Sequence, residues 1–322
     1  MDAAAPRAKR RGGRWRLLPE RGTLSLFELA LLAVCVALVA VPLPQYLQDV
    51  VIQTFLWAGL ALAWNIAGGF AGLISFGHAA FFGVGAYTSS ILAAAFGAVL
   101  TLVCARLRGP FFILSTLAAA EVVRIAALNW ASLTGGAEGL SILPIASIAN
   151  MVFESKATYA ALMLGYFVLI YAITKAVEGS RYGYYLFAAR DDEEAASAAG
   201  VNPLLARTGA MCLSAFLSGI GGSLFAQYFL FLDPTHVISP ELSFQFALLP
   251  ALGGLGTAIG PVLGSFVITP LSELLRSYFG GAGAGLHLAI YGGVLVVVML
   301  YFPSGIAGAL QRLAERRRKV PR

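Results

Sequence analysis

The segment from Tyr46 to Ile66 reads YLQDVVIQTFLWAGLALAWNI and contains one charged residue, Asp49. An α-helix rises 1.5 Å per residue, so about 20 apolar residues cross a hydrocarbon core of about 30 Å. Similar apolar runs recur along the chain, in which 59% of the 322 residues are hydrophobic and 12% are charged. A soluble domain carries about 25% charged residues. The composition therefore predicts an all-α, polytopic membrane helix bundle.

The apolar pattern predicts about eight full spans and a pair of shorter helices. The full spans are expected near residues 26–44, 46–66, 110–129, 158–177, 208–232, 244–255, 260–279 and 286–301. Two shorter apolar pieces lie near 73–87 and 90–105. The segment 69–105 has little room for two full crossings and a turn. We therefore expect a short or re-entrant helix pair there.

Basic residues gather at both ends of the chain. They are Arg7, Lys9, Arg10, Arg11, Arg14, Arg16 and Arg21 at the start, and Arg312, Arg316, Arg317, Arg318, Lys319 and Arg322 at the end. Positively charged segments beside membrane spans stay in the cytoplasm. We expect cytoplasmic tails at 1–24 and 311–322 and a transmembrane domain at 25–310. The net charge of +6 is then explained by membrane orientation, and binding of nucleic acid is not expected. Counting crossings then places 129–157 and 231–243 outside and 178–207 inside.

The predicted cytoplasmic segment 178–207 contains the sequence ARDDEEAASAAG, from Ala189 to Gly200. Asp191 or Asp192 can cap a helix, acidic residues occupy its first turn, and Gly200 can end it. A short helix outside the bilayer is therefore expected. It is either a solvated connector or a docking surface, because small alanine side chains let another protein approach closely.

Five segments carry a resemblance to a known family. The run from Glu194 to Gly200 resembles the "EAA…G" loop of ABC importer permeases, which docks onto the ATPase. GGFAGLISFGHAAFFGVGAY, which begins at Gly68, resembles the branched-chain amino acid permeases of the LivH and LivM type. RLRGPFFILSTLAAAEVVRIAALNWASLTGGAEGL, which begins at Arg106, is closer to LivM. GGLGTAIGPVLGSFVITPLSELLR, from Gly253, and FPSGIAGAL, from Phe302, match the final third. The resemblance covers residues 26–310, but the stretch between 85 and 106 is about one crossing shorter than the family usual.

The resemblance implies the partners of an importer in a bacterial inner membrane. They are a LivH-type second permease, two ABC ATPase subunits, a periplasmic substrate-binding protein and membrane lipid. The sequence has no G-x-x-x-x-G-K-[S/T] loop, so ATP and Mg²⁺ are expected on the ATPase subunits and no cofactor on this chain. The contacts with the ATPase are expected at Arg190, Asp191, Glu194, Ala195, Ala196 and Gly200.

Polar residues in apolar surroundings are the candidates for the translocation pathway. Ser75 and His78 lie among glycines, and Glu121 and Arg124 share one helix face at a spacing of three, as do Glu273 and Arg276. The alternatives are a histidine that bonds across a tight helix pair and an ion pair that anchors a helix at the interface. Helix packing or helix breaks are expected at Gly72, Gly77, Gly83, Gly85, Gly253, Gly254, Gly256 and Gly260.

Two other functions compete with a branched-chain amino acid importer. The same machine could carry another small polar cargo such as urea, amides or aromatic acids. An ion-coupled secondary transporter would need carboxylates near the membrane centre, whereas the acids here lie mainly at helix ends. An enzyme is not expected, because no H-E-x-x-H, C-x-x-C or Ser/His/Asp set stands out, and Cys35, Cys104 and Cys212 are scattered among apolar residues.

Overall fold

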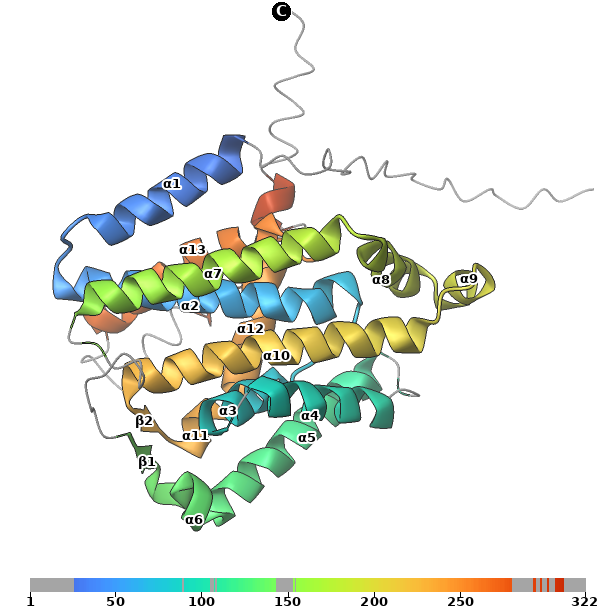
Figure 1. Cartoon of the computed structure of the whole chain (residues 1–322), viewed down its shortest axis with the longest axis horizontal. Helices are drawn as coiled ribbons and strands as arrows, with labels where there is room; N and C mark the ends of the chain where they lie inside the picture. The colour runs from blue at the N-terminus through green and yellow to red at the C-terminus, as the bar shows by residue number, and fades with distance from the viewer. Residues whose placement is uncertain are drawn as a thin grey trace, which may run out of the picture.

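The computed structural model describes residues 26–279, except 89, 105–106, 108, 143–152 and 154, together with 292, 293, 296, 300 and 305–309. The described elements are nearly all helical (Figure 1). They are α1 (Leu26–Ala40), α2 (Gln45–Asn65), a π-helical turn η1 (Ile66–Phe70), α3 (His78–Tyr87), α4 (Ser90–Val103), α5 (Pro110–Asn129), α6 (Ala131–Thr134), a 3₁₀ turn η2 (Gly136–Glu138), β1 (Leu140–Ser141), α7 (Lys156–Glu178), α8 (Arg181–Asp191), α9 (Glu193–Ala198), α10 (Pro203–Phe229), β2 (Phe231–Leu232), α11 (Pro234–Val237), α12 (Pro240–Gly253) and α13 (Ile259–Phe279).

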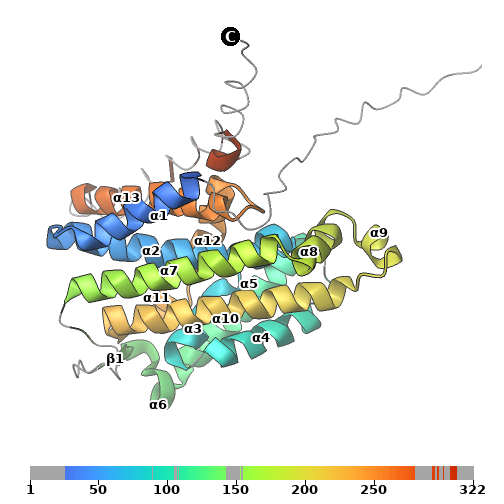
Figure 2. The same ribbon diagram turned by 45° about the horizontal axis from the view of Figure 1, so that its top comes forward.

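Helices α2, α7 and α10 run side by side through the bundle (Figures 1 and 2). Within the described residues, four helices are long and apolar enough to cross a membrane: Gln45–Phe70, Pro110–Asn129, Lys156–Glu178 and Pro203–Phe229. These findings confirm an all-α membrane protein. The total of about eight spans stays a prediction, and most of the expected span at 286–301 lies outside the described residues.

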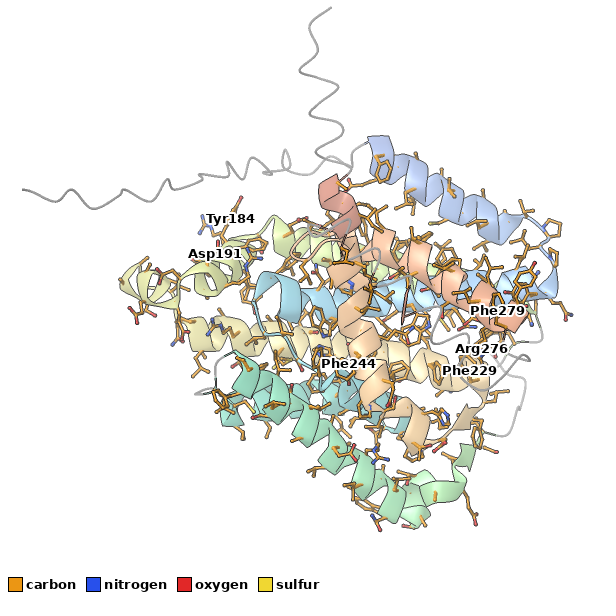
Figure 3. The ribbon with its side chains drawn as sticks, turned by 180° about the vertical axis from the view of Figure 1, so that it is seen from behind. Tyr184, Asp191, Phe229, Phe244, Arg276 and Phe279 are labelled. Carbon is orange, nitrogen blue, oxygen red and sulfur yellow. The ribbon has the colours of Figure 1, made fainter. Side chains whose placement is uncertain are left out.

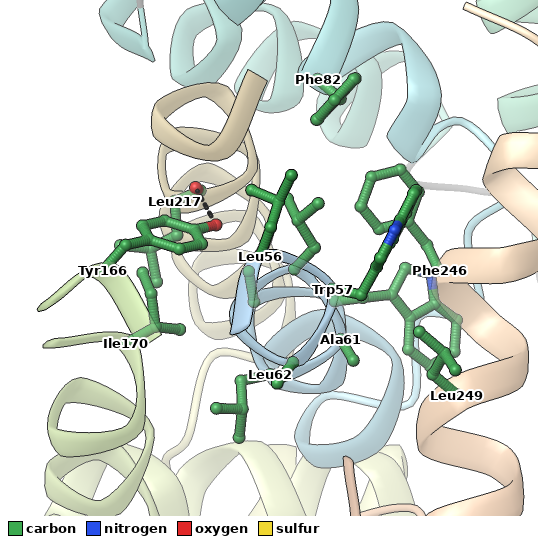
Figure 4. Packing of buried hydrophobic residues seen from close by; sticks show 14 of the residues in the cluster. Leu56, Trp57, Ala61, Leu62, Phe82, Tyr166, Ile170, Leu217, Phe246 and Leu249 are labelled. Carbon is green, nitrogen blue, oxygen red and sulfur yellow. Dashed lines mark hydrogen bonds between the residues drawn. The ribbon is translucent and has the colours of Figure 1, made fainter. Parts of the chain in front are cut away.

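The centre of the bundle is α2, which is buried along most of its length. Its side chains pack against α7 on one side and against α12 and α13 on the other. Trp57 meets Phe246 of α12 edge to face at a centroid distance of 5.8 Å, and Tyr166 of α7 donates a 3.1 Å hydrogen bond to the carbonyl of Leu217 on α10 (Figure 4). Seen from behind, α12 crosses the direction of α2 steeply (Figure 3).

Two short helices occupy the segment where the sequence predicts a cramped pair. Helix α3 has 10 residues and α4 has 14, so neither reaches the length of a full span. Both pack along α10. Gly222 of α10 makes this contact possible, because a Cβ there would collide with the carbonyl oxygen of Phe82. The chain between η1 and α3, residues 71–77, is not helical.

The connections gather at two opposite ends of the bundle (Figure 1). At one end, called here the β1 end, Leu140 pairs with Leu232 and Ser141 with Phe231 in a short antiparallel ladder. At the other end, called the α8 end, α8 and α9 project beyond the long helices. The described residues 130–142 and 230–238, from the predicted outside segments, lie toward the β1 end, and the predicted inside segment forms the α8 end. Which end faces the cytoplasm stays a prediction.

Candidate functional site at the α8 end

The segment 178–207 forms two short helices that meet at Asp192. Ser180 caps α8 by accepting a hydrogen bond from the Gly183 amide, and Asp192 caps α9 by accepting bonds from the amides of Glu194 and Ala195. Asp192 has extended backbone dihedral angles, which end α8 and let α9 start in a new direction. Gly200, at φ +85°, ends the segment as expected.

Helix α9 is held against the bundle on one side and exposed on the other. Arg207 of α10 donates to the carboxylate of Glu193 at 2.9 Å and to the carbonyl of Ala189 at 2.9 Å. Ala196 is buried in this contact, whereas Glu194 and Ala195 are exposed. Of the predicted alanine pair, only Ala195 is therefore free to meet another protein.

Helix α8 is fixed along its length to α10 and to the end of α2. Tyr182 donates a 2.7 Å hydrogen bond to the carbonyl of Ala206, and burial raises the pKa of Tyr182 to about 12. The phenol is therefore neutral at physiological pH and remains a donor. Farther along the helix, Phe187 packs edge to face on Phe70 at a centroid distance of 5.2 Å.

Arg190 reaches from α8 to the end of η1. Its Nη1 donates a 2.7 Å hydrogen bond to the carbonyl of Gly69, its Nε donates to Asp191 at 3.0 Å, and the guanidinium lies 5.2 Å from the Phe187 ring centroid. The last carbonyls of a helix lack intrahelical partners and carry partial negative charge. Arg190 therefore supplies a cation at the C-terminal end of the α2–η1 helix.

The same helix end holds the turn between α12 and α13, residues 254–257, called here the 254–257 turn. The buried Asn65 side chain donates to the carbonyl of Thr257 at 3.0 Å and accepts from the amide of Gly256 at 3.1 Å. Gly69 must be glycine at this contact, because a Cβ would overlap the Asn65 side chain and lie 2.7 Å from the Gly256 nitrogen. Asn65, Gly69 and Arg190 thus join α8, α2 and the 254–257 turn in one contact, called here the inner clasp.

His78 and Ser75 are both buried inside the bundle. His78 Nε2 and the Ser214 hydroxyl lie 2.8 Å apart, and Ser214 donates to the carbonyl of Ala63 at 2.7 Å. The carbonyl of Ser75 accepts from the indole of Trp64 at 2.9 Å. His78 Nδ1 has no hydrogen-bond partner among the described residues. The imidazole therefore links α3 to α10 and, through Ser214, to α2.

Glu121 and Arg124 form the ion pair that their spacing predicts. Arg124 Nε donates to Glu121 at 2.8 Å, and an Arg124 Nη also bonds the second carboxylate oxygen. The two side chains remain partly exposed on α5. Ser75 and His78 therefore do not share a surface with Glu121 and Arg124.

The predicted glycines serve two structural purposes. Gly72, Gly254 and Gly256 have positive φ angles, which side chains with a Cβ rarely adopt. A Cβ at any of the others would meet a neighbouring segment at less than 3.0 Å: these are Gly77, Gly83, Gly85, Gly253 and Gly260. The backbone approaches of Gly85 to Gly219 and of Gly253 to Gly260 show how closely the helices pack at these glycines.

Comparison with known proteins assigns this architecture to a family. Residues 46–300 match the model of the branched-chain amino acid transport system / permease component family. The chain belongs to this family. The match spans α2 to α13 and therefore includes both the inner clasp and α8–α9.

Curated relatives agree with this membership. The permease is 26% identical to the high-affinity branched-chain amino acid transport system permease protein LivM of Escherichia coli K12, over 80% of this chain and 69% of that protein. It is 26% identical to the LivM protein of Salmonella typhimurium LT2, over 87% and 74%. The LivH protein of the same Salmonella strain is 22% identical, over 78% and 91%. No solved structure matches.

Sequence reasoning missed three polar contacts of the permease. Asp49 accepts hydrogen bonds from Lys156 at 2.7 Å and from Tyr228, which ties α2, α7 and α10 together at the β1 end. Glu28 of α1 pairs with Lys175 of α7 at 2.8 Å. Asn65 completes the third contact, within the inner clasp. These partners lie far apart in the sequence. The charges of Asp49 and Glu28 inside apolar segments signalled that each needed a partner, but not which one.

Proposed function

We propose that this chain is a transmembrane permease subunit of an ATP-binding-cassette importer for branched-chain amino acids in a bacterial inner membrane. Family membership and the names of the LivM and LivH relatives support the transport role and the cargo. The same resemblance supports two ABC ATPase subunits, a LivH-type permease and a periplasmic binding protein as partners. Both termini and α8–α9 lie on the cytoplasmic side in this proposal.

The observation that carries the coupling role is the exposed face of α9, on a helix that is fixed to the bundle. Glu194 and Ala195 face away from the chain, while Arg207 and the buried Ala196 hold the opposite face. An ATPase subunit that docks on Glu194 and Ala195 would move α9 and α8 together. We assign Asp191 to the rim of this surface, because its side chain is 71% exposed.

The inner clasp gives this movement a route into the bundle. Arg190 belongs to α8 and contacts the carbonyl of Gly69, and Asn65 holds the 254–257 turn at the same place. A displacement of α8 by the ATPase would pull Arg190 from Gly69 and free the 254–257 turn, which precedes α13. ATP hydrolysis on a partner would thereby open and close the α8 end without any catalytic group on this chain.

Purification from the native host in a mild detergent, followed by mass spectrometry, tests the assembly. A tagged wild-type chain should bring two ATPase copies and a second permease for each copy of itself. The Ala195→Trp variant should insert normally and lose the ATPase subunits but keep the second permease. Ser180→Ala, which weakens a cap on the same segment, is the matched control and should retain them. Recovery of the wild-type chain alone would reject the proposal.

A further inference from the structure

The non-helical segment 71–77 exposes part of its backbone beside a membrane-spanning helix. The amide of Phe76 donates a 3.1 Å hydrogen bond to the hydroxyl of Thr116, which lies nearly two turns inside α5. Gly77 packs against the Thr116 carbonyl, so the segment lies at the depth of α5 and not beyond its end. Ile74 of this segment is 40% exposed. Irregular backbone at membrane depth is tolerated where it is covered by protein or lines water, but not against lipid.

An exposed aromatic pair continues this surface from the segment 71–77 to α12. The rings of Phe76 and Phe244 lie 4.5 Å apart, and Phe244 is 48% exposed. Phe244 lies in the middle of the face seen from behind, between the ends of the bundle (Figure 3). One helical turn before it, Glu241 begins α12 and interacts electrostatically with Arg124 of α5. The surface therefore runs from Ile74 across α12 to the charged pair of Glu121 and Arg124 on α5.

The charged pair is exposed on the flank of α5 that faces α12. The side chains of Glu121 and Arg124 are 38% and 25% exposed. Val122 is 66% exposed, but the helical turn of about 100° per residue points it away from this flank. Ala126, four residues and so about one turn further along, lies on the same outer side as Val122 and is also exposed. Helix α5 thus has one apolar exposed side and one flank with both a carboxylate and a guanidinium.

We propose that the surface formed by Ile74, Phe76, Glu121, Arg124, Glu241 and Phe244, called here the α5–α12 face, is this subunit's wall of the aqueous translocation path. Acyl chains can solvate neither an ion pair nor exposed irregular backbone, so we infer that lipid does not cover this face. The inference rests on the proposed function, which supplies the second permease subunit as the opposite wall. Val122 and Ala126 face lipid.

The α5–α12 face suits a small dipolar solute. The Glu121 carboxylate can accept from an ammonium group and the Arg124 guanidinium can donate to a carboxylate, so both ends of a zwitterion find a partner at one place. Phe76 and Phe244 offer an apolar surface for an aliphatic side chain next to it. Ser75 and His78 lie behind this wall and hold it in position through Trp64 and Ser214.

Cysteine accessibility in the assembled transporter tests the assignment. In the starting protein, Cys35, Cys104 and Cys212 are replaced by serine or alanine. Single cysteines are then introduced as Phe244→Cys, Ile74→Cys, Val122→Cys and Ala126→Cys. The probe is a positively charged, membrane-impermeant methanethiosulfonate, applied to the complex in lipid nanodiscs. Reaction needs both water and a thiolate, so the first two positions should react about tenfold faster or more than the last two. Ile74→Cys keeps the test decisive if Phe244→Cys does not assemble.

The same preparations separate failure of this inference from failure of the proposed function. Reaction at Val122 as fast as at Phe244, or no reaction at either Phe244 or Ile74, overturns the α5–α12 face. If ATP-driven leucine uptake is normal in that case, the importer assignment stands and only the wall is wrong. If Phe244→Cys and Ile74→Cys react while no ATPase subunit accompanies the chain, the aqueous wall stands and the importer assignment falls.

Discussion

The guanidinium of Arg190 on α8 donates a 2.7 Å hydrogen bond to the carbonyl oxygen of Gly69, which lies 121 positions earlier in the chain. This bond holds the one long cationic side chain of the ARDDEE run against the bundle with 33% of it exposed, whereas the side chain of its acidic neighbour Asp191 is 71% exposed. Arg190 therefore contacts the permease itself, and its contact with the ATPase stays a prediction. The bond connects the segment expected to bind the ATPase with the end of the most buried helix in the bundle.

Replacing Arg190 with Met should uncouple transport from ATP hydrolysis. The variant loses a hydrogen bond from a charged donor, which contributes about 1.5 kcal/mol or more. This loss shifts the equilibrium between the closed and the open inner clasp about tenfold toward the open form. We expect transport per ATP to fall by about that factor while the ATPase subunits stay bound. The ratio of leucine uptake to phosphate release in proteoliposomes measures it.

Arg181→Met is the matched control for Arg190→Met, since it removes the same charge from the exposed start of α8. It should leave the ratio of uptake to hydrolysis unchanged. An equal loss in both variants would show that net charge on α8, and not the bond to Gly69, sets the coupling.

Two glycine-to-alanine substitutions should have opposite effects on stability. A Cβ at Gly222 would collide with the backbone of Phe82, and relief of this overlap costs about 1–3 kcal/mol. A Cβ at Gly165 of α7 has nothing within 4 Å, so alanine there should stabilise the helix by about 1 kcal/mol. Thermal unfolding in detergent should show a lower midpoint for Gly222→Ala and an equal or higher midpoint for Gly165→Ala.

The Asp49–Lys156 pair should contribute little free energy in spite of its short distance. Its side chains are 33% and 37% exposed, so solvent screens the pair and a coupling energy of about 0.5–1 kcal/mol is expected. A double-mutant cycle with Asp49→Asn and Lys156→Met, read by unfolding, isolates this energy. Asp49→Asn alone should cost more, because Tyr228 also donates to this carboxylate. A coupling energy near zero, together with normal stability of both single variants, would show that the pair does not stabilise the protein.

Glu121→Gln should impair uptake without lowering the amount of assembled complex. The amide keeps the shape of the carboxylate but removes the negative charge that pairs with Arg124 on the α5–α12 face. We therefore expect uptake to fall about tenfold. Val122→Ala, one residue along and on the side that faces lipid, should transport normally. Loss of assembly in Glu121→Gln would indicate instead an ion pair that anchors α5.

Local patterns predicted most of the helices, while contacts between distant segments came only from the structure. The apolar run 110–129 predicts α5 to the residue, because Pro110 starts the helix at a position where its missing amide costs nothing. Asp192 and Gly200 bound α9 as their cap chemistry indicates. The bond that holds α9 against α10, however, comes from Arg207, which lies fourteen residues beyond its partner Glu193.

The candidate site could be predicted only in part, for the same reason. The spacing of Glu121 and Arg124 predicts their pairing, because both lie on one helix face. No local pattern shows that Ala196 turns inward while Ala195 turns outward, or that Asn65 serves the 254–257 turn. The first depends on the packing of α9 against α8 and α10, and the second on the contact of the end of α2 with the 254–257 turn. Reasoning from single segments reaches neither.

The most direct test of the importer assignment is ATP-driven uptake by the purified complex in proteoliposomes. Leucine uptake should require ATP on the side where α8 and α9 lie. In the Ala195→Leu variant, uptake should fall to background while the ATPase subunits still hydrolyse ATP. The reason is that the bulkier side chain disturbs the docking surface and contacts nothing inside the bundle. Uptake that proceeds without ATP on a sodium or proton gradient, and that is unchanged in Ala195→Leu, would contradict the account and indicate an ion-coupled transporter.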